Sequence, residues 1–461
     1  MNLFGLLASI QEIPSYNKLV KELKIGSDKT CVFALDVAKP YLVVCLHHDL
    51  GLPALVLTAR PERARELYEE ISAWCDSDAL PWFFPEPDAL PYERLSSDPY
   101  VVQQRMRVMA GLSGKLDTPL IISSAHAIWR KTVSVSDFAS SRHVLRKSMK
   151  INLEQMLARW VSLGYEVENT VELPGAVSRR GGILDIYPTH SDLPARIELF
   201  GDEVESIRLF DPASQRSIEQ VAEIEITPAR ELVISENRRR DIGHFLDLST
   251  LNDGARDRVG EEIGRLARGQ WFDGIESYAS MVNSGTLLDY MPAHSVVILD
   301  QPDLIESELQ SLEAQAIDLR RGHIERGELP KNFPTPYFVW SELVPEIDKF
   351  DLRMDLDHWG DGERGHIINF NSAPSFSGQI TMFIEGVKEI IEGGSRLIIV
   401  SQQAARLAEI LEEQDIFTVP VKNIEQIPPP SSVTLVQGLL AGGWVVGGDR
   451  HAQRLRDIRL H

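Results

Sequence analysis

Two short stretches of this chain, residues 179–188 and 195–203, read RRGGILDIYP and ARIELFGDE. Side chains alternate along a β-strand, so Arg196 and Phe200 share one face, opposite the aliphatic residues between them. A soluble domain turns its apolar face inward, which makes the face with Arg196 and Phe200 the solvent-facing candidate. An exposed Phe flanked by Arg is typical of a protein-binding hot spot. The alternative is a Phe200 covered by a neighbouring helix.

The residues around these stretches form a longer, gap-free pattern. Its members are Gly175, Arg180-Gly181-Gly182, Asp185, Pro188, Arg196, Phe200, Asp202-Glu203, Ser206-Ile207-Arg208, Phe210-Asp211 and Gln215-Arg216-Ser217. This pattern resembles the module shared by the repair helicase UvrB and the transcription-repair coupling factors (Mfd). The likeness to the coupling factors extends over nearly the whole chain. In that family the module docks UvrA, so the resemblance implies that UvrA is a partner and that Arg180, Arg196 and Phe200 bind it.

The composition is that of an ordinary soluble globular protein, and 461 residues suffice for three or four domains. The net charge is −21. A DNA-binding protein usually carries a basic surface, because phosphate neutralisation supplies much of its affinity. We therefore expect weak or no direct DNA binding by this chain, and partners with basic surfaces.

The three cysteines, Cys31, Cys45 and Cys75, are scattered and form no CxxC motif. This spacing argues against a disulfide framework and a zinc site, and it fits a reducing cytosol. The first seven residues are apolar but read as an amphipathic helix, and no apolar run is long enough to span a membrane. We expect a cytoplasmic protein with no metal, no cofactor and no membrane contact. Nothing indicates an obligate dimer, and we expect a monomer.

Short apolar runs alternate with helical patterns in the first part of the chain. Residues 53–57 and 120–123 read as strands buried on both faces, and residues 61–74 place apolar side chains at helical spacing. This rhythm predicts a parallel sheet with helices on its faces. Residues 296–300 predict one more buried strand.

We predict a multi-domain α/β protein. A degenerate UvrB-like, helicase-like parallel-sheet domain is split between residues 1–140 and 229–330. A β-rich α+β UvrA-interaction domain is inserted at residues 141–228. A linker punctuated by prolines, residues 331–346, leads to a small C-terminal α/β domain at residues 347–461.

A nucleotide site is predicted to have decayed. A phosphate-binding loop needs Gly-x-x-x-x-Gly-Lys followed by Ser or Thr, because the glycines let successive backbone N–H groups surround the phosphates. The aligned stretch keeps Lys29 and Thr30, but Leu23 replaces the first glycine and Asp28 the second. A carboxylate at that position repels phosphate, so we expect an ordinary turn before a helix.

The second nucleotide motif is altered as well. The strand at residues 296–300 ends in Asp300, as a Walker-B strand does. In the active helicases of the family that the chain resembles, the next residue is a Glu that orients the attacking water. Here it is Gln301, and an amide cannot accept a proton as a general base. Two defects at the two ends of one ATP site predict a fold that keeps its shape without hydrolysis.

By the same resemblance, a full coupling factor continues into an RNA-polymerase-binding domain and a double-RecA motor. This chain ends at His461, before either, and the tail from Asp449 does not match the expected continuation. We expect a truncated or frameshifted reading frame or a natural short form, which would reach RNA polymerase only through the missing domains. In the full family protein the carboxy-terminal domain masks the UvrA-docking face, so we expect constitutive UvrA binding here.

The leading hypothesis is the UvrA-recruiting amino-terminal part of a transcription-repair coupling factor, acting in transcription-coupled nucleotide excision repair without hydrolysing ATP. The first alternative is an ATP-dependent DNA helicase or translocase active in its own right, which ATP turnover with and without DNA would reveal. The second is a product that folds but has no partner in the cell.

Overall fold

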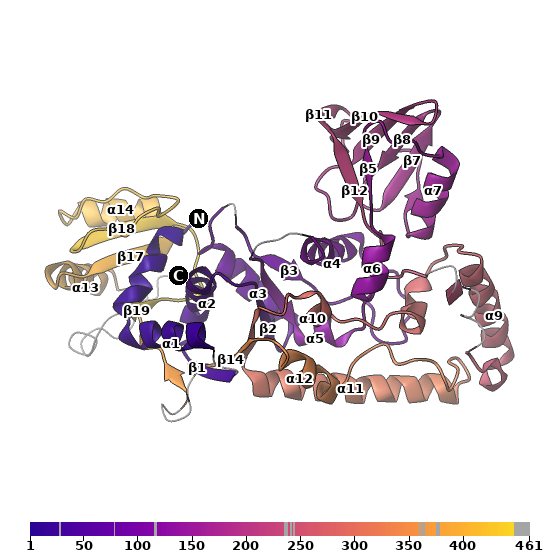
Figure 1. The fold of residues 1–461 in the computed structure, drawn as a ribbon. Coiled ribbons are helices and arrows are strands. Elements are labelled where there is room, and N and C mark those ends of the chain that lie inside the picture. Colours follow the sequence, from indigo (N-terminus) through magenta and orange to yellow (C-terminus); the bar gives the residue numbers. More distant parts are fainter. Residues whose placement is uncertain are drawn as a thin grey trace.

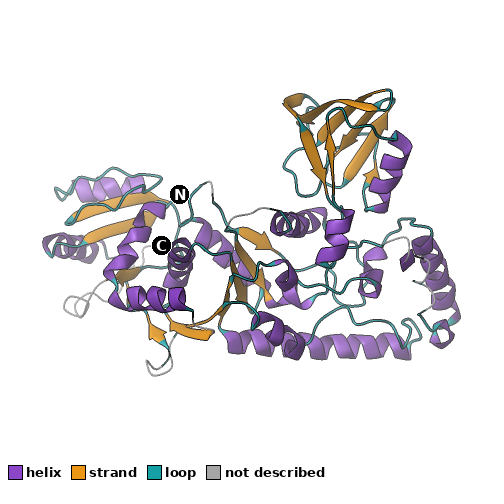
Figure 2. Ribbon diagram, viewed as in Figure 1, coloured by secondary structure: helices purple, strands orange, loops and turns teal. Residues whose placement is uncertain are grey.

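The computed structural model describes residues 1–26, 29–77, 79–114, 118–234, 238–239, 242, 245–358, 360, 365–374 and 379–446. The described chain is a mixed α/β protein. It comprises a body around one large parallel sheet, a β-rich lobe standing on that body, and a small α/β unit at the opposite end (Figure 1). Helices cover the body and the small unit, whereas the lobe is mostly strand (Figure 2).

The large sheet has seven strands in the order β15-β1-β14-β13-β2-β4-β3, and every neighbouring pair is parallel. The strands are β1 (Lys29–Phe33), β2 (Ala54–Thr58), β3 (Trp82–Phe84), β4 (Leu120–Ser124), β13 (Val296–Asp300), β14 (Leu352–Asp357) and β15 (His366–Ile367). Strands β2, β4 and β13 are buried along their whole length. Parallel strands with helices on both faces are buried in this way, and the predicted parallel sheet is confirmed.

Alternate residues of the central strands enter two separate cores, one on each face of the sheet. Val56 and Ile298 lie in one core, and Leu57 and Leu299 lie in the other. The first face is covered by η1 (Phe4–Glu12), α1 (Pro14–Ile25), η2 (Asp36–Ala38), α2 (Lys39–Leu50) and α3 (Pro61–Ser72). The second is covered by α4 (Pro99–Leu112), α5 (Ala125–Trp129), α6 (Val135–Ser141), α10 (Leu287–Tyr290), α11 (Pro302–Glu325) and α12 (Trp340–Ile347).

Strand β14 lies inside the large sheet between β1 and β13, and β15 lies at its edge. Both strands fall within residues 347–461, the range predicted as the small domain, and both pair in the large sheet. Strand β14 alternates apolar with charged residues, a pattern typical of a half-exposed strand. Here the charges are buried together instead, and Arg353 donates Nε–H to Oδ1 of Asp355 at 2.9 Å.

The lobe is built on a six-stranded sheet in the order β11-β10-β9-β8-β7-β6. Its strands are β6 (Glu166–Val167), β7 (Ala176–Arg180), β8 (Ile183–Ile186), β9 (Ala195–Phe200), β10 (Glu203–Phe210) and β11 (Ser217–Val221). Helix α7 (Leu153–Ser162) packs on one face, where the fully buried Trp160 shares a core with Ile197 of β9. The chain enters through β5 (His143–Arg146) and leaves through β12 (Glu223–Ile226), which pair antiparallel.

Below the lobe, helix α9 (Asp253–Ala267) lies at one end of the body (Figure 1). It is flanked in sequence by η3 (Leu248–Thr250) and η4 (Ile275–Met281). The small unit pairs β17 (Arg396–Ser401) with β18 (Ser432–Gln437) in parallel, against α13 (Ile380–Glu392) and α14 (Ala404–Glu412). A further pair joins β16 (Phe370–Ser372) to β19 (Trp444–Val446).

In the part of the chain that the model describes, no helix is both long enough and apolar enough to cross a membrane.

Candidate functional site

Two tight hairpins bring the predicted interaction residues to the same end of the lobe. Arg180 pairs with Ile183 across the turn that joins β7 to β8, and Phe200 pairs with Glu203 across the turn that joins β9 to β10. The first turn position of each hairpin, Gly181 and Gly201, has φ of +62° and +67°. Such a backbone conformation favours glycine, so the sequence itself specifies these sharp reversals.

The side chain of Phe200 is open to solvent. Phe200 is 80% exposed. It is the last residue of β9, and the other residues on its face of that strand, Arg196 and Glu198, are charged. The exposure expected from alternation is therefore present, and none of the described helices covers the ring. Arg180 is exposed on the same face and donates Nη2–H to the carbonyl of Asn169 at 2.7 Å. Among the described residues no carboxylate forms an ion pair with Arg180, so its charge is open to a partner.

Arg196 is engaged within the lobe, although alternation places it on the same face as Phe200. Its Nε and Nη2 donate to the two carboxylate oxygens of Asp185 at 2.8 and 2.9 Å. Its guanidinium also lies over the ring of Phe210, 4.7 Å from the centroid. The side chain is only 21% exposed, and the hydrogen bond to Asp185 raises the pKa of Arg196 above its ordinary value. Arg196 therefore holds neighbouring strands together and presents only an edge to solvent.

Sequence reasoning missed the polar network on this face. Glu198 accepts a hydrogen bond from the hydroxyl of Ser206 at 2.7 Å and pairs with Arg208 at 3.2 Å. Both partners lie on β10, directly beside β9. Alternation along β9 placed Glu198 on the correct face, but its partners depend on strand register, which the sequence pattern did not specify.

The stretch that aligned with a phosphate loop lies between a helix and a strand. Leu23 is buried in helix α1, and Lys29 and Thr30 begin strand β1; Asp28 lies outside the described residues. A phosphate loop joins the end of a strand to the start of a helix, whereas this stretch joins a helix to a strand. We predicted an ordinary turn before a helix, whereas here a helix comes before the stretch and a strand follows it. Lys29 instead forms an ion pair with Asp355 at 3.1 Å.

The strand-to-helix connection that could hold phosphate follows β1 and ends at Lys39, the first residue of α2. Lys39 is buried, and its Nζ lies 2.6 Å from Oδ1 of Asp300 and 2.8 Å from Oδ1 of Asp36. Arg63 approaches the other oxygen of Asp300 at 3.8 Å. The connection contains no glycine. The charges of Lys39 and of Asp300, the last residue of β13, thus neutralise one another.

Strand β13 covers the residues predicted as a Walker-B-like strand, 296–300. Asp300 closes the buried strand, and Gln301 follows with φ of +60° as the residue before α11. The backbone N–H of Gln301 donates to the carbonyl of Leu356 at 2.9 Å. The side-chain amide of Gln301 cannot act as a general base.

A protein-family model matches residues 144–232 and is described as the UvrB interaction domain. The matched range contains the whole six-stranded sheet, with Arg180, Arg196 and Phe200. It bears out the resemblance that the residue pattern indicated.

Over most of its length the chain is also similar to transcription-repair-coupling factors. The factor of Bacillus subtilis (strain 168) is 26% identical over 450 residues, covering 93% of this chain and 37% of the relative. That of Myxococcus xanthus is 26% identical over 305 residues, covering 62% and 25%. That of Staphylococcus aureus (strain bovine RF122 / ET3-1) is 23% identical over 456 residues, covering 91% and 37%. The chain thus spans 25–37% of these relatives' length, and the matches support its assignment to the amino-terminal region of such factors.

Proposed function

We propose that this chain recruits UvrA and acts in transcription-coupled nucleotide excision repair. The match of residues 144–232 to the UvrB interaction domain and the similarity to transcription-repair-coupling factors support the proposal. The observation that carries it is Phe200, which is 80% exposed at the end of the lobe where Arg180 is also exposed. An aromatic and an arginine at one protruding end are the residue types that anchor interfaces. Arg196 acts there as a positioning residue through Asp185.

The test is calorimetric titration of purified UvrA with the wild-type chain and variants. Removing a central aromatic anchor costs on the order of 2 kcal/mol of binding free energy, so Phe200→Ala should weaken binding about 30-fold, and Arg180→Ala should weaken it as well. Phe417→Ala is the matched control, because Phe417 is 76% exposed but lies outside the lobe. If Phe200→Ala and the wild type bind UvrA with equal affinity, Phe200 is not part of the UvrA-binding site.

The large sheet is, in this proposal, a helicase-like scaffold that no longer hydrolyses ATP. The contacts of Lys39 with Asp300 and Asp36, together with Gln301, support this reading. We expect no ATP turnover with or without DNA. DNA-stimulated turnover that Lys39→Met abolishes would instead support an ATP-dependent translocase. We also propose that the chain is a cytoplasmic monomer with weak or no DNA binding. Light scattering measures the oligomeric state, and filter binding measures the affinity for DNA.

A further inference from the structure

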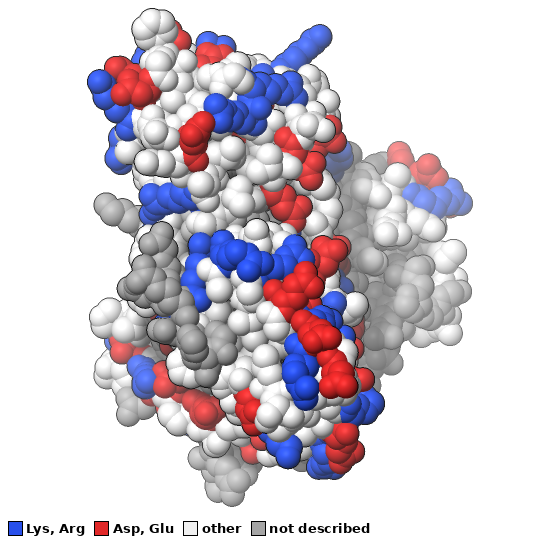
Figure 3. Space-filling view, turned by 90° about the vertical axis from the view of Figure 1, so that its right-hand side faces the viewer, with Lys and Arg blue, Asp and Glu red and all other residues white. Residues whose placement is uncertain are grey.

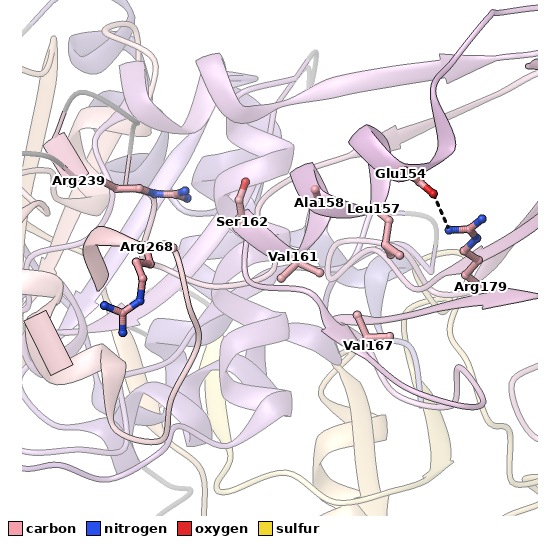
Figure 4. Close-up of a pocket in the computed structure, with 10 residues that line it drawn as sticks. Glu154, Leu157, Ala158, Val161, Ser162, Val167, Arg179, Arg239 and Arg268 are labelled. Carbon is pink, nitrogen blue, oxygen red and sulfur yellow. Dashed lines mark ion pairs between the residues drawn. The ribbon is translucent and has the colours of Figure 1, made fainter. Parts of the chain in front are cut away.

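A cleft of about 540 Å³ opens between the lobe and the end of helix α9 (Figure 4). Helix α7 and strands β6 and β7 form its lobe side, and the residues around Arg239 and Arg268 form its body side. On the face shown in Figure 3, Lys and Arg side chains gather across the middle of the molecule, between the lobe and the body. The cleft is therefore a local basic site on a chain whose net charge is −21.

One wall of the cleft is apolar. Leu157, Ala158 and Val161 of helix α7 line it, together with Val167 of β6, which is 58% exposed. Trp160 of the same helix is fully buried in the lobe core, so α7 uses only part of its apolar surface for folding. On the cleft side of the helix Leu157 and Val161 are half-buried and Ala158 is exposed, so apolar surface remains open there.

The other wall carries two guanidinium groups, Arg239 and Arg268, that form no ion pair with any residue the structure describes. Arg268 donates Nε–H to the side-chain oxygen of Gln270 at 2.9 Å and, among the described residues, forms no ion pair. The Nε of Arg239 is buried without a hydrogen-bond partner among those residues. Gly269 has φ of +68°, and a Cβ there would lie 2.5 Å from Nη1 of Arg239. The guanidinium of Arg239 therefore occupies space that a side chain at position 269 would fill.

Arg179 and Glu154 close the lobe end of the cleft at a separation of 3.9 Å, which is too long for a hydrogen bond. Arg179 lies on the α7 face of β7, whereas its neighbour Arg180 points to the opposite face. The cleft and the surface around Phe200 are therefore two distinct sites on opposite faces of one sheet.

We propose that this cleft binds an acidic, aliphatic segment of a partner protein. Aliphatic side chains of the segment pack against Leu157, Ala158 and Val161, and its carboxylates pair with Arg239 and Arg268. Forked hydrogen bonds between guanidinium and carboxylate groups supply the specificity. The apolar wall and Glu154 distinguish the cleft from a groove for nucleic acid, which tracks phosphates with cations and stacks bases on aromatic rings.

The experiment measures fluorescence anisotropy of a labelled peptide, Gly-Glu-Leu-Leu-Asp-Glu-Gly, on the full chain. Arg268→Ala removes a charge-assisted contact and should weaken binding about tenfold. Ala158→Glu adds a repelling carboxylate at an exposed helix position and should weaken it similarly. Arg258→Ala, on α9 and outside the cleft, and Phe200→Ala should both bind as the wild type does. The Phe200 variant separates this proposal from UvrA recruitment.

Peptides with Lys in place of the acidic residues, or Ser in place of Leu, should bind at least tenfold more weakly. Equal binding by wild type, Arg268→Ala and Ala158→Glu would overturn the proposal. So would two other results. One is tight binding of a single-stranded oligonucleotide that Arg268→Ala abolishes, with no binding of the acidic peptide. The other is a self-association, seen by light scattering, that the same variants abolish.

Discussion

Removal of the Arg196 side chain tests whether this residue supports the lobe or contacts a partner. In Arg196→Ala, the carboxylate of Asp185, which is 4% exposed in the wild type, loses both forked hydrogen bonds. Breaking a buried ion pair from one side costs several kcal/mol, because the other charge stays buried without compensation. Arg196 is itself 21% exposed, which places the expected loss at the lower end, about 3 kcal/mol.

Hydrogen exchange of peptides from β8 to β10, followed by mass spectrometry, reports this loss for the lobe alone. A decrease of about 3 kcal/mol in opening free energy corresponds to roughly 150-fold faster exchange of the most protected amides. Arg208→Ala is the control: its pair with Glu198 is partly exposed, and such pairs contribute about 1 kcal/mol or less. Unchanged exchange in Arg196→Ala together with lost UvrA binding would refute the reasoning and make Arg196 a direct contact.

Three further predictions follow from particular contacts. Lys39→Met should destabilise the large sheet by about 3 kcal/mol, since it leaves Asp300 buried, and adding Asp300→Leu should recover most of that loss; exchange of β13 amides measures both, and additive losses would contradict the coupling. Burial lowers the pKa of His143 to about 4, and the indole of Trp160 donates to its Nε2 at 3.0 Å. The unfolded chain therefore binds a proton before the folded lobe does, so lobe stability should fall as pH drops from about 6.5 towards 4; thermal melts at several pH values should show a flatter profile for His143→Gln, and an identical profile would exclude this histidine as the cause. Gly201→Ala should cost about 1 kcal/mol, because φ of +67° strains an L-residue even in open space; an unchanged melting temperature would show that the turn relaxes.

Alternation and burial in single strands were readable from the sequence, whereas contacts between strands were not. The apolar run ending at Asp300 is the predicted buried strand, and Phe200 is exposed on the predicted face. The engagement of Arg196 escaped prediction because its partner Asp185 lies on the neighbouring strand. Their pairing depends on the register of β8 with β9, which arises only when the hairpins fold.

The alignment of Lys29 and Thr30 with a nucleotide motif failed for a related reason. Lys29 and Thr30 matched the end of a short motif, but the motif is meaningful only when a strand comes before it and a helix after it. The residues from 14 to 25 carried the opposite signal, with Pro14 opening a helix and Gly26 ending it. Lys39 could have been found as the lysine opening the next helix, while its pairing with Asp300, 261 positions away, required the fold.

The paired strands β5 and β12 give the lobe entry and exit points that face each other, with His143 opposite Ile226. Because the two ends of the lobe lie side by side, the lobe could be removed and the chain rejoined by a short linker without changing the path of the remaining polypeptide. The same closeness makes the lobe a good subject for circular permutation. Its new termini could be opened at a loop remote from Phe200 without disturbing the hairpins that display the ring.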